Sequence, residues 1–172
     1  MAELKDIIEH LQPRINSHNP NVHQKIAVFD LDNTLLIGDI GDAVFAQLKK
    51  YESEQLLTIQ QKPMPLEWQE YRHLIHKGKQ EKAYKRVVTC MAGLPLNTLL
   101  QTTRNIIHST SNNIHINGDT VPVPTVNPTL YSLIRYLKKK GFRIFIISAS
   151  NHYSVRMIAR ELFDLPETSA FG

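Results

Sequence analysis

Two short, strongly apolar segments constrain the fold of this 172-residue chain more than any other feature. The first is the continuous run 26–29 and the second is 142–147, and turn-forming polar residues follow each of them. Short apolar segments of this kind are typical of buried strands that are covered on both faces. Helical patterns flank the second run, at 127–141 and 151–163, and this strand and helix alternation predicts a parallel α/β sheet.

Most of the segment between the two runs has helical periodicity. We expect helices at 66–76, 79–89 and 96–108, separated by proline and glycine, and at most a small hairpin near 114–121. A further helix begins near Gly41, and an amphipathic helix is expected at the N-terminus, 3–16. The sequence therefore predicts a mostly helical insertion between two strands of one sheet.

Composition excludes several classes of protein. Apolar residues make up 42% and charged residues 21% of the chain, as in a folded globular domain. A single cysteine, Cys90, rules out an internal disulfide framework and is expected to be buried. No apolar run approaches the roughly 20 residues that cross a bilayer. We expect a cytoplasmic protein that binds no membrane.

The basic residues do not form one binding stripe. The net charge is +4, but lysine and arginine are spread over 49–50, 77–86 and 138–140. We expect these groups to be solvated surface, with no nucleic acid as partner. The eight histidines have no thiolate or carboxylate partners at zinc-site spacing, so no histidine metal site is expected.

Two carboxylates follow the first predicted strand. Asp30 and Asp32 lie two residues apart, where ligands bind in open parallel sheets. One carboxylate at such a site can attack phosphorus, and the other can transfer protons to the leaving group and from water. Two aspartates at a strand end are weak evidence for catalysis when taken alone, because aspartate and asparagine are also common in turns and helix caps.

The end of the second strand supplies a complementary group. Ser148 lies at its carboxyl end, and Ser150 and Asn151 begin the next helix. A hydroxyl and the backbone N–H groups of a helix N-terminus form a phosphate site. The same residues also suit an ordinary helix cap, and the two roles are compatible.

These two segments together resemble the haloacid dehalogenase-like hydrolases. Residues 29–35 (FDLDNTL) are similar to the first signature of that family, Asp-x-Asp-x-Thr after an apolar strand. Residues 146–150 (IISAS), with Val155, Arg156, Ile158 and Ala159 behind them, resemble the second signature. This form of the second signature resembles that of the phosphoserine phosphatase and phosphorylcholine phosphatase-like branch. The resemblance implies a doubly wound, Rossmann-like α/β core, 1–38 and 124–172, with a helical cap at 39–123.

The resemblance also implies a role for each motif residue. Asp30 would be the nucleophile and Asp32 the acid and base of an Mg²⁺-dependent phosphomonoester hydrolase. Ser148, Ala149 and Thr34 would bind the phosphoryl group, and Asp30 and the backbone carbonyl of Asp32 would hold Mg²⁺. The partner would be a small phosphorylated substrate, and the sequence leaves the oligomeric state open.

The chain departs from the family pattern downstream. No lysine follows Ser150, and the later acids, Glu161, Asp164 and Glu167, lack the glycine-acid context of the family's metal site. With two parallel strands and a third about to begin near Ala170, we expect a fragment of a longer protein. The alternatives are a catalytically inactive phosphate- and Mg²⁺-binding module, and an enzyme that transfers phosphate to an acceptor other than water.

Substrate recognition is expected where the chain enters the cap. Asp39 and Asp42 follow the nucleophile loop and could face a cationic substrate such as a choline or amine ester. Trp68 and Tyr71 are expected on the inner face of a cap helix and not in contact with substrate.

Overall fold

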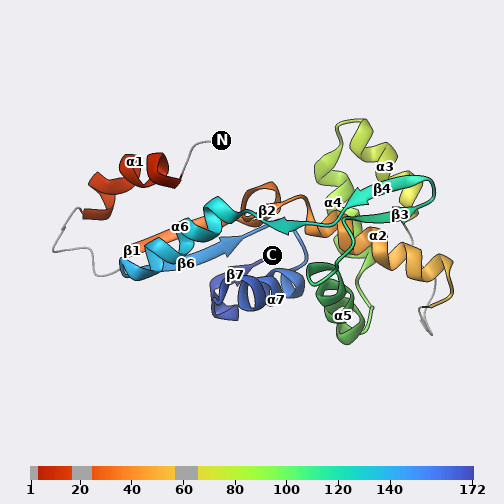
Figure 1. The fold of residues 1–172 in the computed structure, drawn as a ribbon. Coiled ribbons are helices and arrows are strands. Elements are labelled where there is room, and N and C mark those ends of the chain that lie inside the picture. The colour runs from red at the N-terminus through yellow and green to blue at the C-terminus, as the bar shows by residue number, and fades with distance from the viewer. Residues whose placement is uncertain (1–3, 17–24, 57–65) are drawn as a thin grey trace.

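The computed structural model describes residues 4–16, 25–56 and 66–172, which form an α/β fold. The elements in chain order are α1 (Leu4–Asn16), β1 (Lys25–Asp30), the turn η1 (Leu31–Leu35), β2 (Leu36–Ile37), α2 (Ile40–Ser53), α3 (Trp68–His76), α4 (Gln80–Cys90), α5 (Leu96–Ile107), β3 (Asn113–Ile116), β4 (Asp119–Pro122), β5 (Thr125–Val126), α6 (Pro128–Lys139), β6 (Phe142–Ile147), α7 (His152–Phe163), the turn η2 (Glu167–Ser169) and β7 (Ala170–Phe171). Figure 1 shows the sheet with α6 and α7 at one end and α2 to α5 with the β3–β4 hairpin at the other.

The central sheet is parallel, as predicted. Its strand order is β1-β6-β7, and the register pairs Lys25 with Phe142 and Asp30 with Ile147. The expected third strand is present, because Ala170 and Phe171 pair with the end of β6. The predicted fold class, an α/β parallel-sheet core with an inserted and mostly helical cap, is confirmed.

One prediction about β1 is wrong for the part of the chain that the structure describes, because its residues cover this strand on one face only. Ile26 is 52% exposed and Val28 is 55% exposed, and Ile147 and Phe171 on the neighbouring strands are similarly open. Residues paired in register share a face of a parallel sheet, so these side chains form one apolar surface. The connections from β1 to β6 and from β6 to β7 run in the same direction across the sheet. Because such connections are right-handed, α6 and α7 lie together on the opposite face.

Helices α3, α4 and α5 begin and end within two residues of the bounds predicted from the apolar periodicity. The hairpin is also present, with β3 and β4 antiparallel from Asn113–Pro122 to Ile116–Asp119. The two-residue ladder between β2 and β5 was not predicted. It pairs the two chain segments that lie at either end of the inserted segment.

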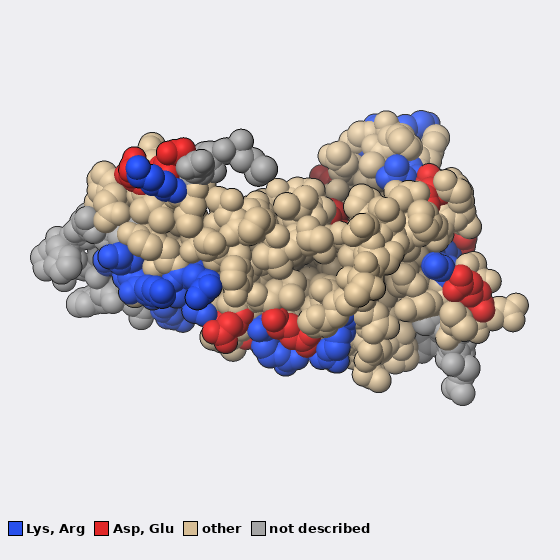
Figure 2. Space-filling view, viewed as in Figure 1, with Lys and Arg blue, Asp and Glu red and all other residues tan. Residues whose placement is uncertain are grey.

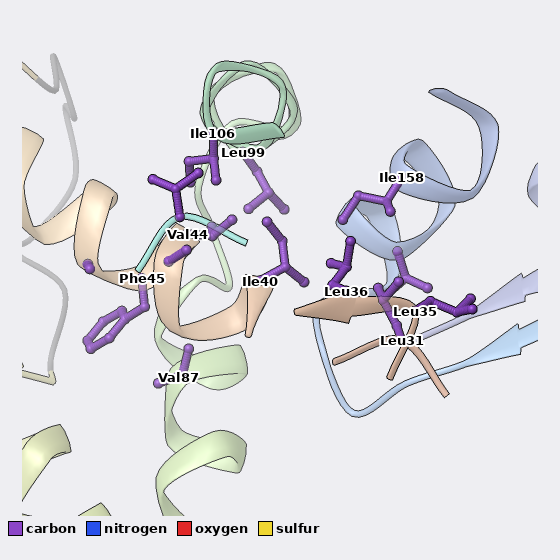
Figure 3. Packing of buried hydrophobic residues seen from close by; sticks show 14 of the residues in the cluster. Leu31, Leu35, Leu36, Ile40, Val44, Phe45, Val87, Leu99, Ile106 and Ile158 are labelled. Carbon is purple, nitrogen blue, oxygen red and sulfur yellow. The ribbon is translucent and has the colours of Figure 1, made fainter. Parts of the chain in front are cut away.

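The buried residues form a cluster that continues from the core into the cap. Figure 3 shows Leu31, Leu35 and Leu36 near Ile158 of α7, with Ile40 and Val44 of α2 between this group and the cap helices. These leucines flank the polar residues of η1, so burial of the apolar positions fixes the loop that carries Asp32.

The N-terminal helix packs on the core side of the molecule. Leu4, Ile7, Ile8 and Leu11 of its predicted apolar face lie against the buried cluster, and the Tyr136 hydroxyl of α6 donates to Gln12 at 3.2 Å. The side chain of Ile15 and the predicted break 17–24 lie outside the described residues.

Asparagine caps begin the two helices that flank β6, as the sequence predicts. The Asn127 side chain accepts from the N–H groups of Thr129 and Leu130. The Asn151 side chain accepts from those of Tyr153 and Ser154. Capping oxygens at this position satisfy N–H groups that have no partner within the helix.

The surface carries its charges in separate groups. In Figure 2, Lys and Arg on the visible face lie in several patches, some of them beside Asp or Glu. No helix in the described residues has the length and apolarity to span a membrane. Cys90 is buried, as predicted.

Candidate active site

The predicted nucleophile lies at the carboxyl end of β1. Asp30 is exposed, and the Thr34 hydroxyl donates to its Oδ2 at 2.9 Å. The chain turns sharply between them, because Asn33 has a left-handed conformation with φ of 54° and its N–H donates to the Gly38 carbonyl at 2.9 Å. Asparagine tolerates this conformation better than most residues. The turn thus returns Thr34 to the nucleophile.

Asp32 is held by donors from the second predicted motif and from the beginning of α2. The hydroxyls of Ser148 and Ser150 donate to its Oδ2 at 2.8 and 2.7 Å, and the N–H of Ile40 donates to its Oδ1 at 2.8 Å. Ser148 also accepts from the N–H of Ser150 at 2.9 Å. Three donors from two chain segments fix the orientation of this carboxylate.

A second pair of carboxylates lies at the beginning of α2. The Asp39 side chain caps the helix by accepting from the Asp42 N–H at 2.9 Å. Asp42 accepts a short hydrogen bond from the Tyr71 hydroxyl of α3. Gly41 lies between them, and a Cβ at this position would come within 3.0 Å of the Ser150 Oγ. The absence of a side chain therefore allows α2 to approach the second motif.

Burial and charge shift the titration of this pair. The pKa of Asp39 is raised to about 7, chiefly by burial and then by the charges of Asp42 and Asp32. Burial also raises the pKa of Asp42, although the Tyr71 hydrogen bond and the charge of Arg72 oppose the shift. Burial and the same carboxylates raise the pKa of Tyr84 to about 12. The tyrosines next to these acids remain neutral hydroxyl groups at physiological pH.

All four aspartates open on one cavity of about 210 Å³ between the strand ends and the cap. Its walls come from β1, η1, α2, α3, α4 and the beginning of α7. The lining residues are Asp30, Asp32, Asn33, Asp39, Ile40, Gly41, Asp42, Val44, Tyr71, Tyr84, Val87, Val88, Met91, Ala149, Ser150, Asn151 and Ser154. The site is thus a partly closed pocket, with Asp30 and Asp32 at the strand end and Asp39 and Asp42 at the beginning of α2.

The oxygen atoms of Asp30 and Asp32 meet part of what an Mg²⁺ site requires. Mg²⁺ in phosphate sites takes one or two carboxylates and completes its shell with water and phosphate oxygens. The Asp30 carboxylate and the backbone carbonyl of Asp32 would supply two oxygen ligands. No group of three or more histidine, cysteine, aspartate or glutamate residues in the described ranges is placed to hold a metal.

The structure brings together most of the predicted site residues. Asp30, Asp32, Asp39, Asp42 and Ala149 line the same cavity. Thr34 contacts Asp30, and Ser148 contacts Asp32, so in this state both hydroxyls hold carboxylates. Their contact with a phosphoryl group stays a prediction.

Three residues of the site were not predicted. Ser150 was expected only to begin a helix, although its spacing of two from Ser148 was the available signal. Tyr71 was expected to be core and is fully buried, yet its hydroxyl reaches Asp42. Tyr84 of α4 lines the cavity, and nothing in its helical pattern distinguished it from surface residues.

Comparison with known proteins agrees with the fold and the motifs. The family model of the haloacid dehalogenase-like hydrolases matches residues 24–170. No curated protein matches the chain. The match covers most of the chain and includes both motifs, so this chain belongs to the haloacid dehalogenase-like hydrolase family.

Solved structures share the fold at low identity. A phosphoserine phosphohydrolase-like protein from Francisella tularensis subsp. tularensis SCHU S4 has a TM-score of 0.52 and 16% identity over 86% of this chain and 57% of its own. A conserved protein of unknown function from Anaerococcus prevotii DSM 20548 has a TM-score of 0.58 and 14% identity over 100% of this chain and 70% of its own.

A phospho-aspartyl intermediate analogue of phosphoserine phosphatase has a TM-score of 0.46 and 18% identity over 83% of this chain and 53% of its own. The chain therefore spans little more than half the length of this protein and of the Francisella protein.

Proposed function

We propose that the protein to which this chain belongs is an Mg²⁺-dependent hydrolase of small phosphomonoesters that acts through an aspartyl phosphate. The observation that carries the proposal is the pairing of two carboxylates on one cavity. Asp30 is exposed at the strand end, whereas Asp32 is fixed by Ser148 and Ser150 of the second motif. This difference suits one accessible nucleophile and one oriented proton carrier.

The first chemical step forms a bond between a carboxylate oxygen of Asp30 and phosphorus. The bond from phosphorus to the alcohol oxygen breaks, and Asp32 donates its proton to that oxygen. The Thr34 hydroxyl at 2.9 Å holds the nucleophile in place. Reactants held in this way react faster, because the entropy of alignment is lost before the reaction.

The second step releases inorganic phosphate. Asp32 accepts a proton from water, the water oxygen attacks phosphorus, and the bond between phosphorus and Asp30 breaks. Both carboxylates return to their initial states. Mg²⁺, held by Asp30 and the backbone carbonyl of Asp32, would offset the repulsion between carboxylate and phosphate.

The test uses the natural full-length protein with Mg²⁺ and p-nitrophenyl phosphate. We expect Mg²⁺-dependent release of phosphate that Asp30→Asn abolishes, since an amide is not a competent nucleophile here. Asp164→Asn is the matched control, because Asp164 is exposed at the end of α7 and has a left-handed conformation that asparagine also adopts. Equal rates for Asp30→Asn and the native protein would refute the proposal.

The second candidate is a binding module without turnover. The cavity lining in the described residues favours it, because that lining holds no lysine or arginine and a cation is needed next to a phosphate bound by carboxylates. Binding of phosphate and Mg²⁺ with no release of phosphate from any ester would support this function. Transfer to another acceptor would instead appear as a phosphorylated product in place of inorganic phosphate.

A further inference from the structure

The side chain of Asn127 makes two different sets of hydrogen bonds. Its Oδ1 atom accepts from the N–H groups of Thr129 and Leu130 at 3.1 and 3.3 Å, and so caps α6. Its Nδ2 atom donates to the backbone carbonyl of Thr34 at 3.2 Å, 93 residues earlier in the sequence. Helix capping uses the oxygen alone, so the bond to Thr34 is a second role for this residue.

The backbone places Asn127 beside the loop that follows the nucleophile. The β2–β5 ladder pairs Leu36 with Val126, and Asn127 extends this ladder by one residue, because its N–H donates to the Leu35 carbonyl at 2.9 Å. The backbone and the side chain of one residue thus hold two consecutive carbonyl groups of η1, those of Thr34 and Leu35.

The orientation of Thr34 matters because its hydroxyl donates to the Oδ2 atom of Asp30 at 2.9 Å. Threonine is branched at Cβ and has few side-chain rotamers, so the direction of its hydroxyl follows the direction of its backbone. Two hydrogen bonds in sequence therefore connect the beginning of α6 to the predicted nucleophile, from Asn127 to Thr34 and from Thr34 to Asp30.

We propose that Asn127 is a positioning residue for phosphoryl transfer, which holds Asp30 in the orientation for attack by way of Thr34. The proposal rests on the phosphatase function above and adds a residue that lies outside both sequence motifs. Asn127 is not among the residues that line the cavity, so it acts on the reaction through other residues and not through contact with substrate.

Two substitutions separate this role from helix capping. Serine and aspartate cap helices about as well as asparagine, but aspartate has no amide nitrogen and the serine hydroxyl ends one bond closer to the backbone than Nδ2. In the full-length protein with Mg²⁺ and p-nitrophenyl phosphate, we expect kcat/KM to fall at least about fivefold in Asn127→Ser and in Asn127→Asp. Tm should stay within about 3 °C of the native value. An unchanged kcat/KM for Asn127→Ser would overturn the inference, because only the aspartate adds a charge.

Asn105→Asp is the matched control for the chemical change. Asn105 is exposed on α5, accepts from Gln101 at 2.9 Å and lies outside the cavity lining. Its kcat/KM and its Tm should equal those of the native protein. A loss equal to that in Asn127→Asp would contradict a role specific to Asn127.

A double-mutant cycle tests the route through Thr34. Thr34→Val removes the hydroxyl that contacts Asp30 and retains the shape of the side chain. In this background, Asn127→Ser should lower kcat/KM by less than about twofold, because the residue through which it acts no longer holds the nucleophile. A further loss as large as that in the native background would show that Asn127 acts by another route, and the inference would be wrong.

The position of Asp30 can also be measured without turnover. Beryllium fluoride binds a carboxylate oxygen as a mimic of a phosphoryl group, and calorimetry with this anion and Mg²⁺ gives its affinity. The native protein should bind it at least about fivefold more tightly than Asn127→Ser does. Equal binding, or none by the native protein, would overturn the inference even if no ester is hydrolysed. An equal kcat/KM while Asp30-dependent hydrolysis persists would overturn it and leave the phosphatase function intact.

Discussion

The carboxylate of Asp32 accepts hydrogen bonds from two segments that lie far apart in the sequence, the start of α2 and the serines after β6. Gly41 suits this arrangement, because a Cβ at this position would lie 3.0 Å from the Ser150 Oγ, closer than most Cβ contacts. A single glycine thus couples the geometry of the cap entrance to that of the catalytic loop.

Substitution of Gly41 should lower kcat without lowering the stability of the fold. In Gly41→Ala, the new Cβ would lie 3.0 Å from the Ser150 Oγ, so the hydroxyl rotates and loses its bond to Asp32. Loss of one such bond corresponds to a decrease of about tenfold in kcat. Because alanine favours a helix over glycine by about 1 kcal/mol, Tm should not fall. Unchanged kcat for Gly41→Ala would show that Ser150 does not orient Asp32.

At the scale of elements, α5 connects the cap to the core. The Thr103 hydroxyl of α5 and the Ser154 hydroxyl of α7 are 2.9 Å apart and buried. On the same helices, the Arg104 Nη2 donates to Glu161 at 2.7 Å and His108 lies 3.1 Å from that carboxylate. These bonds hold α5 on α7, so movement of the cap would involve α3, α4 and the hairpin more than α5.

The Glu161 contacts should make stability depend on pH. The hydrogen bond from Arg104, with those from His108 and Arg160, lowers the pKa of Glu161 to about 2 in the folded protein, below its ordinary value of 4.5. A lowered pKa stabilises the fold above about pH 4.5, and the contribution is lost as pH falls toward 2. Glu161→Gln should therefore reduce the free energy of unfolding by about 1 kcal/mol at pH 7 and by less at pH 3.

Urea unfolding of the full-length protein at both pH values measures this difference. Glu167→Gln is the control, because this exposed carboxylate contacts Arg160 without joining the two helices. Its effect should stay within about 0.5 kcal/mol. An equal loss for Glu161→Gln at pH 7 and pH 3 would contradict an ionic contribution.

The elements that could be predicted from sequence are those with strong local signals. Asn127 and Asn151 begin helices through their own side chains, and the apolar runs of β1 and β6 mark strands without tertiary information. The β2–β5 ladder has two residues in each strand, too few for a periodic pattern. Tyr84 enters the cavity because of how α4 packs on α2, and its own segment carries no sign of this.

At the scale of the whole molecule, the sheet has one apolar face that no described element covers. Ile26, Val28, Ile147 and Phe171 lie on it, and parallel sheets in folded proteins are covered on both faces. The apolar run at 26–29 correctly indicated a strand, but local sequence does not state which segment covers its second face. We predict that this face is buried against other polypeptide in the folded full-length protein.

Thiol labelling can test the coverage. Val28→Cys and Ile37→Cys are a matched pair, because each native side chain is 55% exposed in these 172 residues. In a Cys90→Ala background of the full-length protein, we expect Cys at position 28 to react at least about tenfold more slowly than Cys at position 37, because only the first would be buried. Similar rates would mean that the sheet face is open to solvent.

The central claim is that Asp30 becomes phosphorylated and Asp32 carries the protons, and a burst measurement on Asp32→Asn tests it most directly. p-Nitrophenolate leaves without a proton, so Asp30 can still attack in this variant, whereas water can no longer be activated at the normal rate. Mixing full-length Asp32→Asn with Mg²⁺ and p-nitrophenyl phosphate should release p-nitrophenol in a burst stoichiometric with protein, followed by turnover about 10²–10⁴-fold slower than native. Peptide mapping should then find the phosphoryl group on Asp30. Steady release without a burst, or a phosphoryl group on another residue, would contradict the account.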